Sequence, residues 1–131
     1  MKKTVFLCVG GDARQIYMSR KLAQYGRVYT YRIYDHSPDV TALGSLGEAE
    51  EKADVLVLPI MSGGGLEIPC QRGGVADCRE LAPYLRKNAI VTGGRLGTEL
   101  IEYFSALGFE VADYFKREEL VIKNCIPTAE G

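Results

Sequence analysis

Short apolar runs alternate with amphipathic stretches along this chain, and no other feature of the sequence limits its fold as strongly. Three of the runs have the length of β-strands, and they lie at Thr4–Val9, Asp54–Ile60 and Asn88–Thr92. A chain that alternates strands with helices builds βα units, which require right-handed crossovers and a parallel sheet. The sequence therefore predicts a three-layer α/β domain with a doubly wound, mainly parallel sheet.

The remaining elements follow from periodicity and from turn residues. A helix is expected over 12–25, with Asp12 as its N-cap and Gly26 at its end. The run Asp54–Ile60 is apolar throughout, which is typical of a central strand. These elements favour a flavodoxin-like or Rossmann-like architecture. The other expected elements are a strand at Arg27–Tyr34, a short charged helix at Leu46–Ala53, a glycine-rich loop at Met61–Gly74, helices at Val75–Lys87 and Gly97–Leu107 (the latter closed by Gly108), and strands at Phe109–Phe115 and Leu120–Lys123.

Size and charge exclude several classes of protein. The 131 residues suit a single domain spanning 1–131, and the net charge of -1 argues against binding nucleic acid or an anionic membrane through bulk charge. No apolar run approaches the ~20 residues of a membrane span. The four cysteines are far apart and the one histidine is His36, so the sequence predicts no zinc site and a cytoplasmic, reducing environment.

In a doubly wound sheet, ligands bind beyond the carboxyl ends of the strands, near the point where the strand order reverses. This rule gives a short set of candidate segments. They are Gly10–Arg14, Asp35–Pro38, Ile60–Gly65, Thr92–Arg95 and the tail after Asn124.

The segment that follows the first strand is the strongest candidate for an anion site. Gly10 and Gly11 allow close backbone approach, and the helix that begins at Asp12 presents free N–H groups to an anion. Arg14 could clamp a carboxylate with two hydrogen bonds. The alternative is a tight turn with a solvated arginine. The second candidate is Thr92–Arg95, with Thr92 and Gly93 as its binding residues, because this segment leaves the fourth strand and opens a helix.

A dinucleotide site within this domain is the main rival interpretation. The fingerprint G-x-G-x-x-G is absent, although Asp35 occupies the position of a ribose-binding acid, about 20 residues further on. Asp35 equally suits a turn. The loop Met61–Gly74 lacks the lysine of a P-loop and could be a lid, an oligomer contact or disordered. Cys70 and His36 have no activating partner nearby in sequence.

Two segments carry a resemblance to a known family. Gly10–Gln15 reads GGDARQ directly after the first strand, and Asn124–Gly131 reads NCIPTAEG. Both resemble the amino-terminal domain of the A subunit of dipicolinate synthase, and the order of elements agrees over essentially the whole chain. In that family, a helix and an NADP-binding Rossmann domain follow the I-P-T-x-E-G segment.

The resemblance implies an NADP-dependent oxidoreductase of sporulating bacteria that oxidises a hydroxy-tetrahydrodipicolinate and works with the B subunit of dipicolinate synthase. It implies a dicarboxylate substrate and no cofactor in this domain. The anion site inferred from the residues fits that substrate, so we expect it to be bound by Gly10, Gly11, Asp12, Arg14, Thr92 and Gly93. Residues 1–131 alone would then be inactive. Pro127, Thr128 and Glu130 would form the hinge to the absent domain. A ligand-binding or docking module without catalysis remains the alternative, and a homo-oligomer stays open.

Overall fold

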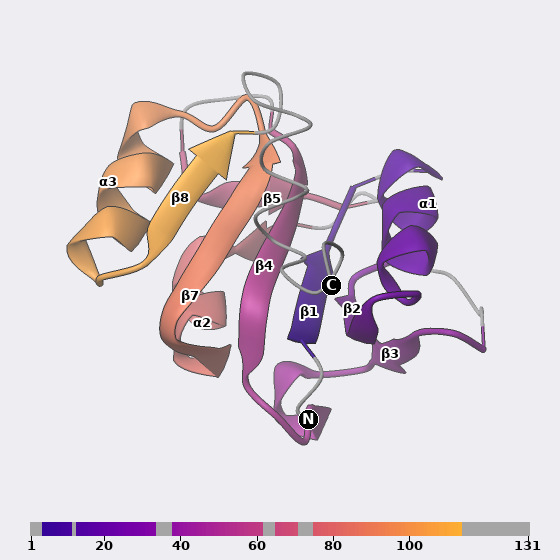
Figure 1. The fold of residues 1–131 in the computed structure, drawn as a ribbon. Helices are drawn as coiled ribbons and strands as arrows, with labels where there is room; N and C mark the ends of the chain where they lie inside the picture. Colours follow the sequence, from indigo (N-terminus) through magenta and orange to yellow (C-terminus); the bar gives the residue numbers. More distant parts are fainter. Residues whose placement is uncertain (1–3, 12, 34–37, 62–64, 71–74, 114–131) are drawn as a thin grey trace.

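The computed structural model describes residues 4–11, 13–33, 38–61, 65–70 and 75–113. Eight strands, three α-helices and two 3₁₀ turns lie in this part of the chain (Figure 1). In chain order they are β1 (Thr4–Val9), α1 (Ala13–Leu22), β2 (Gly26–Tyr31), β3 (Thr41–Leu43), η1 (Leu46–Glu48), β4 (Ala53–Ile60), β5 (Glu67–Pro69), β6 (Val75–Asp77), α2 (Cys78–Leu81), η2 (Ala82–Tyr84), β7 (Leu85–Gly94), α3 (Thr98–Ala106) and β8 (Glu110–Asp113).

Six strands form one sheet in the order β3-β2-β1-β4-β7-β8, and every pair in it is parallel. From β1, the chain first builds β2 and β3 on one side and then β4, β7 and β8 on the other. This is the Rossmann strand order, and its switch point lies between β1 and β4. The predicted doubly wound parallel sheet is therefore confirmed.

Two apolar clusters, one on each face of the sheet, make the structure three-layered. One cluster joins Leu7 and Leu56 of the sheet to Leu81 of α2 and to Leu100 and Phe104 of α3. The other joins the opposite-facing side chains of the strands to α1. Figure 1 shows α1 beside β1 and β2, and α3 beside β7 and β8. Right-handed crossovers place the helices in this way, because the strands spread in opposite directions from the switch point.

Several predicted elements are confirmed. The strand Thr4–Val9 has the bounds that the sequence predicts. The expected central strand is β4, which lies between β1 and β7, and its Leu56 and Leu58 are fully buried. The helix before Gly108 is α3, and Gly108 has a φ of 95° beyond its end. The strand predicted at 109–115 is β8, whereas 120–123 lies outside the described residues.

Two predicted helices are wrong. Val75–Lys87 divides into β6, α2, η2 and the start of β7, because β6 pairs with β5 and the Asp77 carboxylate accepts the N–H of Arg79, which starts the helix only at Cys78. Leu46–Ala53 contains the single 3₁₀ turn η1 and then becomes extended at Ala49. The edge strand β3 was not predicted at all.

Gly26 has a different role from the predicted helix end. Helix α1 ends at Leu22, and Gly26 is the first residue of β2. A Cβ atom on Gly26 would lie 2.1 Å from the carbonyl oxygen of Thr4. The glycine is therefore needed for the close approach of β2 to β1.

Candidate functional site at the carboxyl edge of the sheet

The turn between β1 and α1 requires both of its glycines. Gly10 has a φ of 65° and Gly11 a φ of 93°, and the Gly10 N–H donates to the carbonyl of Tyr31 at 3.0 Å. A Cβ on Gly11 would lie 2.7 Å from the Cβ of Pro59 in β4. The backbone of this turn thus lies directly against β4 at the switch point. Asp12, the predicted N-cap, lies outside the described residues.

Gln15 joins the two central strands at the same place. Its side chain is buried, with the residue 3% exposed, and its Nε2 donates to the carbonyl of Val57 at 2.8 Å and to that of Val9 at 3.3 Å. These carbonyls belong to β4 and β1, so one amide ties together the strands that flank the switch point. Sequence reasoning missed this role, although Gln15 belongs to the GGDARQ segment. A polar residue in the first turns of a helix gives no signal that it is buried.

Arg14 lies next to Gln15 in the first turn of α1, and it is exposed. A cation at the amino end of a helix is unfavourable, because the helix dipole is positive there. The helix dipole therefore does not favour an arginine at this position.

The second candidate lies in β7 rather than in a loop. The strand continues to Gly94, so Thr92 and Gly93 lie inside it, and α3 begins only at Thr98. Thr92 is 5% exposed, and its buried hydroxyl has no hydrogen-bond partner among the described residues. A Cβ on Gly93 would lie 2.9 Å from Leu58 Cβ and from Leu96 Cδ2. Gly93 therefore allows close packing of β7 against Leu58 and Leu96.

The structure places two arginines in unusual backbone conformations at this edge. Arg32 follows β2 and has a φ of 62°, and Arg95 follows β7 and has a φ of 53°. The left-handed conformation costs a side chain with a Cβ roughly 1–2 kcal/mol. The Arg32 guanidinium lies 5.4 Å from the centroid of the Tyr31 ring. Arg95 belongs to the predicted segment Thr92–Arg95. Nothing in the sequence identifies Arg32 as a site residue, because the presence of an arginine does not predict a left-handed backbone.

The cysteines of the described region are not activated nucleophiles. Burial raises the pKa of Cys78 to about 12, and burial also raises the pKa of Cys8 far above its usual range. Burial raises the pKa of Cys70 as well, and the nearby charge of Arg32 lowers it by less. All three thiols therefore stay protonated near neutral pH.

Several candidates lie outside the described residues. They are Asp35, His36, two parts of the 61–74 loop (62–64 and 71–74) and the hinge residues Pro127, Thr128 and Glu130. Within the described ranges, no three His, Cys, Asp or Glu residues are grouped as metal ligands. None of the helices described is long and apolar enough to cross a membrane.

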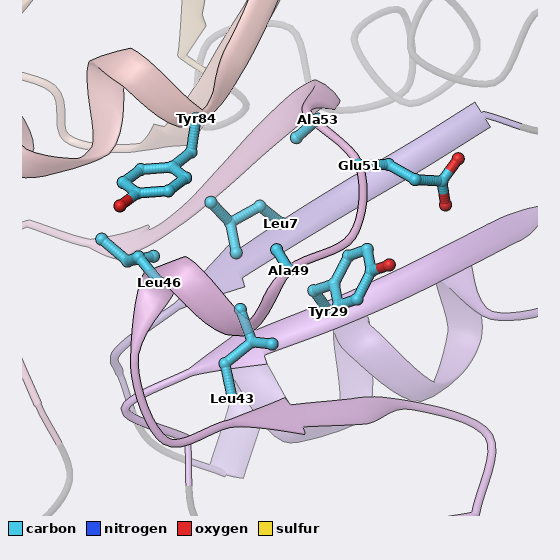
Figure 2. A pocket seen from close by; sticks show the side chains of 8 residues that line it. All are labelled: Leu7, Tyr29, Leu43, Leu46, Ala49, Glu51, Ala53 and Tyr84. Carbon is cyan, nitrogen blue, oxygen red and sulfur yellow. The ribbon is translucent and has the colours of Figure 1, made fainter.

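A pocket lies on the face of the sheet that α2 and α3 cover, beside η1 (Figure 2). Its volume of about 10 Å³ is room for about one water molecule, far less than the roughly 300 Å³ or more of a ligand site. Figure 2 shows Leu7 and Ala49 at its centre, with Tyr29 and Glu51 at one side. The Tyr29 hydroxyl is buried and has no partner in the part of the chain that the structure describes. This pocket is too small for a substrate, so the carboxyl edge remains the candidate site.

Comparisons with known proteins agree with this architecture. A crystal structure of the dipicolinate synthase A subunit from Bacillus halodurans matches with a TM-score of 0.73 and 22% identity, over 98% of this chain and 47% of that one. The A chain of dipicolinate synthase from Bacillus subtilis matches with a TM-score of 0.68 and 20% identity, over 100% of this chain and 46% of that one. A putative formate dehydrogenase from Pyrobaculum aerophilum gives a TM-score of 0.55 and 17% identity, over 91% of this chain and 42% of that one.

The chain thus spans less than half the length of these solved structures, and likeness at such identities establishes the fold. No curated protein sequence matches it. A family model described as the N-terminal domain of the dipicolinate synthase A subunit matches residues 5–115. The chain therefore belongs to the family of N-terminal domains of the dipicolinate synthase A subunit.

Proposed function

We propose that this chain is the substrate-side domain of an NADP-dependent dipicolinate synthase, which oxidises a hydroxy-tetrahydrodipicolinate to dipicolinate during sporulation. The observation that carries the proposal is the turn between β1 and α1. Two glycines with positive φ hold the start of α1 against the switch point, and Arg14 lies in the first turn of that helix. The N–H groups of a helix's first turn, the positive end of its dipole and a guanidinium together suit a carboxylate.

The domain supplies substrate positioning in this proposal, and the cofactor is assigned to another domain. Gln15 ties the start of α1 to β1 and β4, and Gly11 lies close to Pro59, so the turn is held closely against β4. The sequence also has no G-x-G-x-x-G fingerprint. Formation of the aromatic ring would require loss of the hydroxyl group as water and of one hydride together with a proton, and NADP bound to another domain would accept that hydride. This domain's own residues would hold the two carboxylates of the ring while the ring C–H bond breaks.

Calorimetric titration of NADP into the 131-residue chain tests whether NADP binds to another domain and not to this one. We expect no measurable binding. Saturable binding with micromolar affinity would contradict the assignment of the cofactor to another domain.

The partners and the compartment follow the family. We propose that the complete protein acts in the cytoplasm together with the B subunit of dipicolinate synthase. The scattered cysteines and the balanced charge of the chain support a cytoplasmic protein that binds neither nucleic acid nor membranes. Co-purification of the complete protein with this B subunit, followed by a turnover assay, distinguishes an enzyme from a docking module without catalysis.

Arg14→Lys in the complete enzyme tests the anion site. The lysine keeps the charge but loses the planar fork, so we expect kcat/KM to fall roughly tenfold to a hundredfold, as for the loss of one charged hydrogen bond worth about 1.5–3 kcal/mol. Because Arg14 is exposed, Tm should change little. A lower Tm with an unchanged kcat/KM would make Arg14 a structural residue and refute the anion site.

A further inference from the structure

Three non-glycine residues of the described region have a positive φ: Arg32, Asn88 and Arg95. Asparagine tolerates this conformation, because its short side chain can bond to the local backbone. Arginine has no such advantage. Two arginines therefore stand where local energetics would favour glycine or asparagine, and backbone strain of this kind gathers at functional sites.

Both arginines lie at the ligand-binding edge of the sheet. Arg32 is the first residue after β2, and Arg95 is the first after β7. Tyr31 pairs with Val9 at the ends of β2 and β1, and Gly94 pairs with Ile60 at the ends of β7 and β4. Cys8 pairs with Val57, so β4 and β7 continue about two residues further along the same edge than β1 and β2. Strands β1 and β4 separate β2 from β7, which puts the two arginines on opposite sides of the switch point, three strand spacings or about 14 Å apart measured across the strands.

The charges at this edge are concentrated rather than typical of the chain. The whole sequence has a net charge of -1, yet Arg14, Arg32 and Arg95 all follow the carboxyl ends of strands and all are exposed. Two acidic residues are described on the β7–β8 side of this edge: Glu99 in the first turn of α3, and Asp113 at the end of β8, whose carboxylate accepts the N–H of Leu96 at 2.9 Å. Asp113 therefore offsets part of the positive charge on the Arg95 side.

We propose that Arg32 and Arg95 are specificity residues that bind the two carboxylates of one small ring dicarboxylate from opposite sides of the switch point. This inference rests on the proposed function and extends it to residues outside the first turn. A guanidinium binds a carboxylate through two parallel hydrogen bonds, so two guanidinium groups on opposite sides select a ligand with two carboxylates. At both positions the left-handed backbone turns the chain out of the strand, and at both an arginine follows the end of the strand.

The proposal predicts opposite effects on stability and on binding. In the complete, NADP-loaded protein, Arg32→Asn and Arg95→Asn each place a tolerant residue at the positive φ. We expect the Tm of the protein without the dicarboxylate to stay the same or rise. The Kd for pyridine-2,6-dicarboxylate, measured by calorimetry, should weaken at least about tenfold in each variant, as for the loss of a charged hydrogen bond. The ratio of the Kd for pyridine-2-carboxylate to the Kd for pyridine-2,6-dicarboxylate should fall toward one.

Two further sets of variants make the test specific. Arg32→Lys and Arg95→Lys keep the charge without the fork, so their Kd values should lie between those of the wild type and the Asn variants. Asn88→Gly changes the third residue with positive φ, which lies well before the end of β7, and should leave the Kd unchanged. If the Asn variants bind both probes like the wild type, or lose binding and Tm together, the assignment of Arg32 and Arg95 is overturned. A wild type that does not bind the dicarboxylate would overturn the proposed function, and this assignment with it.

Discussion

The glycine pairs at the carboxyl ends of β1 and β7 look alike in sequence but are needed for different reasons. After β1 the sequence reads Gly-Gly-Asp-Ala-Arg, and at the end of β7 it reads Gly-Gly-Arg-Leu-Gly. In the first turn, both glycines have a positive φ. At the end of β7, both glycines belong to the strand, and the positive φ falls on Arg95.

The difference shows how one edge of a sheet combines a rigid turn with a strained one. Gly11 combines a φ of 93° with a space too small for a Cβ, so the chain is fixed there by backbone geometry and packing together. Gly93 has only the packing requirement, because its Cβ would meet Leu58 and Leu96. The first turn thus forms a fixed platform, and the second places a charged side chain where glycine would be less strained.

Gly11→Ala should have the largest effect on stability and would test the rigid platform. The new Cβ meets Pro59 at 2.7 Å and the residue keeps an unfavourable φ, so we expect the free energy of unfolding to fall by about 3 kcal/mol. Gly108→Ala is the matched control, because Gly108 has a φ of 95° and open space around it. That variant should lose only about 1–2 kcal/mol. Equal losses in urea unfolding would show that packing against β4 is unimportant.

Gln15→Leu would test the link between β1 and β4. The leucine fills a similar volume but removes both donated hydrogen bonds, so we expect a loss of about 2 kcal/mol in urea unfolding. An unchanged free energy would mean that water replaces the amide.

Gln15→Glu adds a dependence on pH to this test. Two carbonyl oxygens would face the carboxyl group, so burial and repulsion should raise its pKa in the folded state above the usual value of about 4.3. The unfolded state then loses its proton first, and stability should fall as pH rises through and above that value. Stability that is flat between about pH 4 and pH 8, relative to Gln15→Leu, would contradict the buried position.

The sequence predicts those parts of the fold that local patterns control. β1 and β4 are continuous apolar runs, and α3 ends at a glycine, so each was predicted correctly. β3 is short and has a largely exposed pattern, and pairing with β2 defines it rather than any periodicity. The helix predicted at 75–87 failed because pairing with β5 overrides a weak helical pattern.

The candidate site was predictable to a smaller extent. The glycines after β1 signal a turn at the ligand edge, and the topology rule places that turn at the switch point. Gln15 and Arg32 carry no such signal, because burial and backbone angles depend on neighbours far apart in the chain. Gln15 reaches a carbonyl 42 residues away.

Gly93→Ala would test the packing requirement at the end of β7. Its φ is not positive, so the expected loss of about 1.5 kcal/mol comes from overpacking against Leu58 and Leu96 alone. Gly47→Ala is the control, since no described atom lies within 4 Å of the added Cβ. A loss at Gly93 as large as that at Gly11 would remove the distinction between the two turns.

Thr92→Val should have the smallest effect, and it separates burial from ligand binding. The Thr92 hydroxyl is buried and has no partner among the described residues, so replacing it with a methyl group should raise the free energy of unfolding by about 1 kcal/mol. Thr30→Val is the control, because Thr30 lies in the same row of the sheet, through Cys8 and Val57, and its hydroxyl likewise lacks a described partner.

Both valine variants should therefore be stabilised, but only one should lose affinity. If the Thr92 hydroxyl is kept for the substrate, Thr92→Val should weaken dicarboxylate binding several-fold, which corresponds to roughly 1 kcal/mol, while Thr30→Val leaves it unchanged. Calorimetry on the complete protein measures the two Kd values side by side. If the two variants bind the dicarboxylate equally well, Thr92 lies outside the site, and Arg95 is then the one proposed binding residue at the carboxyl end of β7.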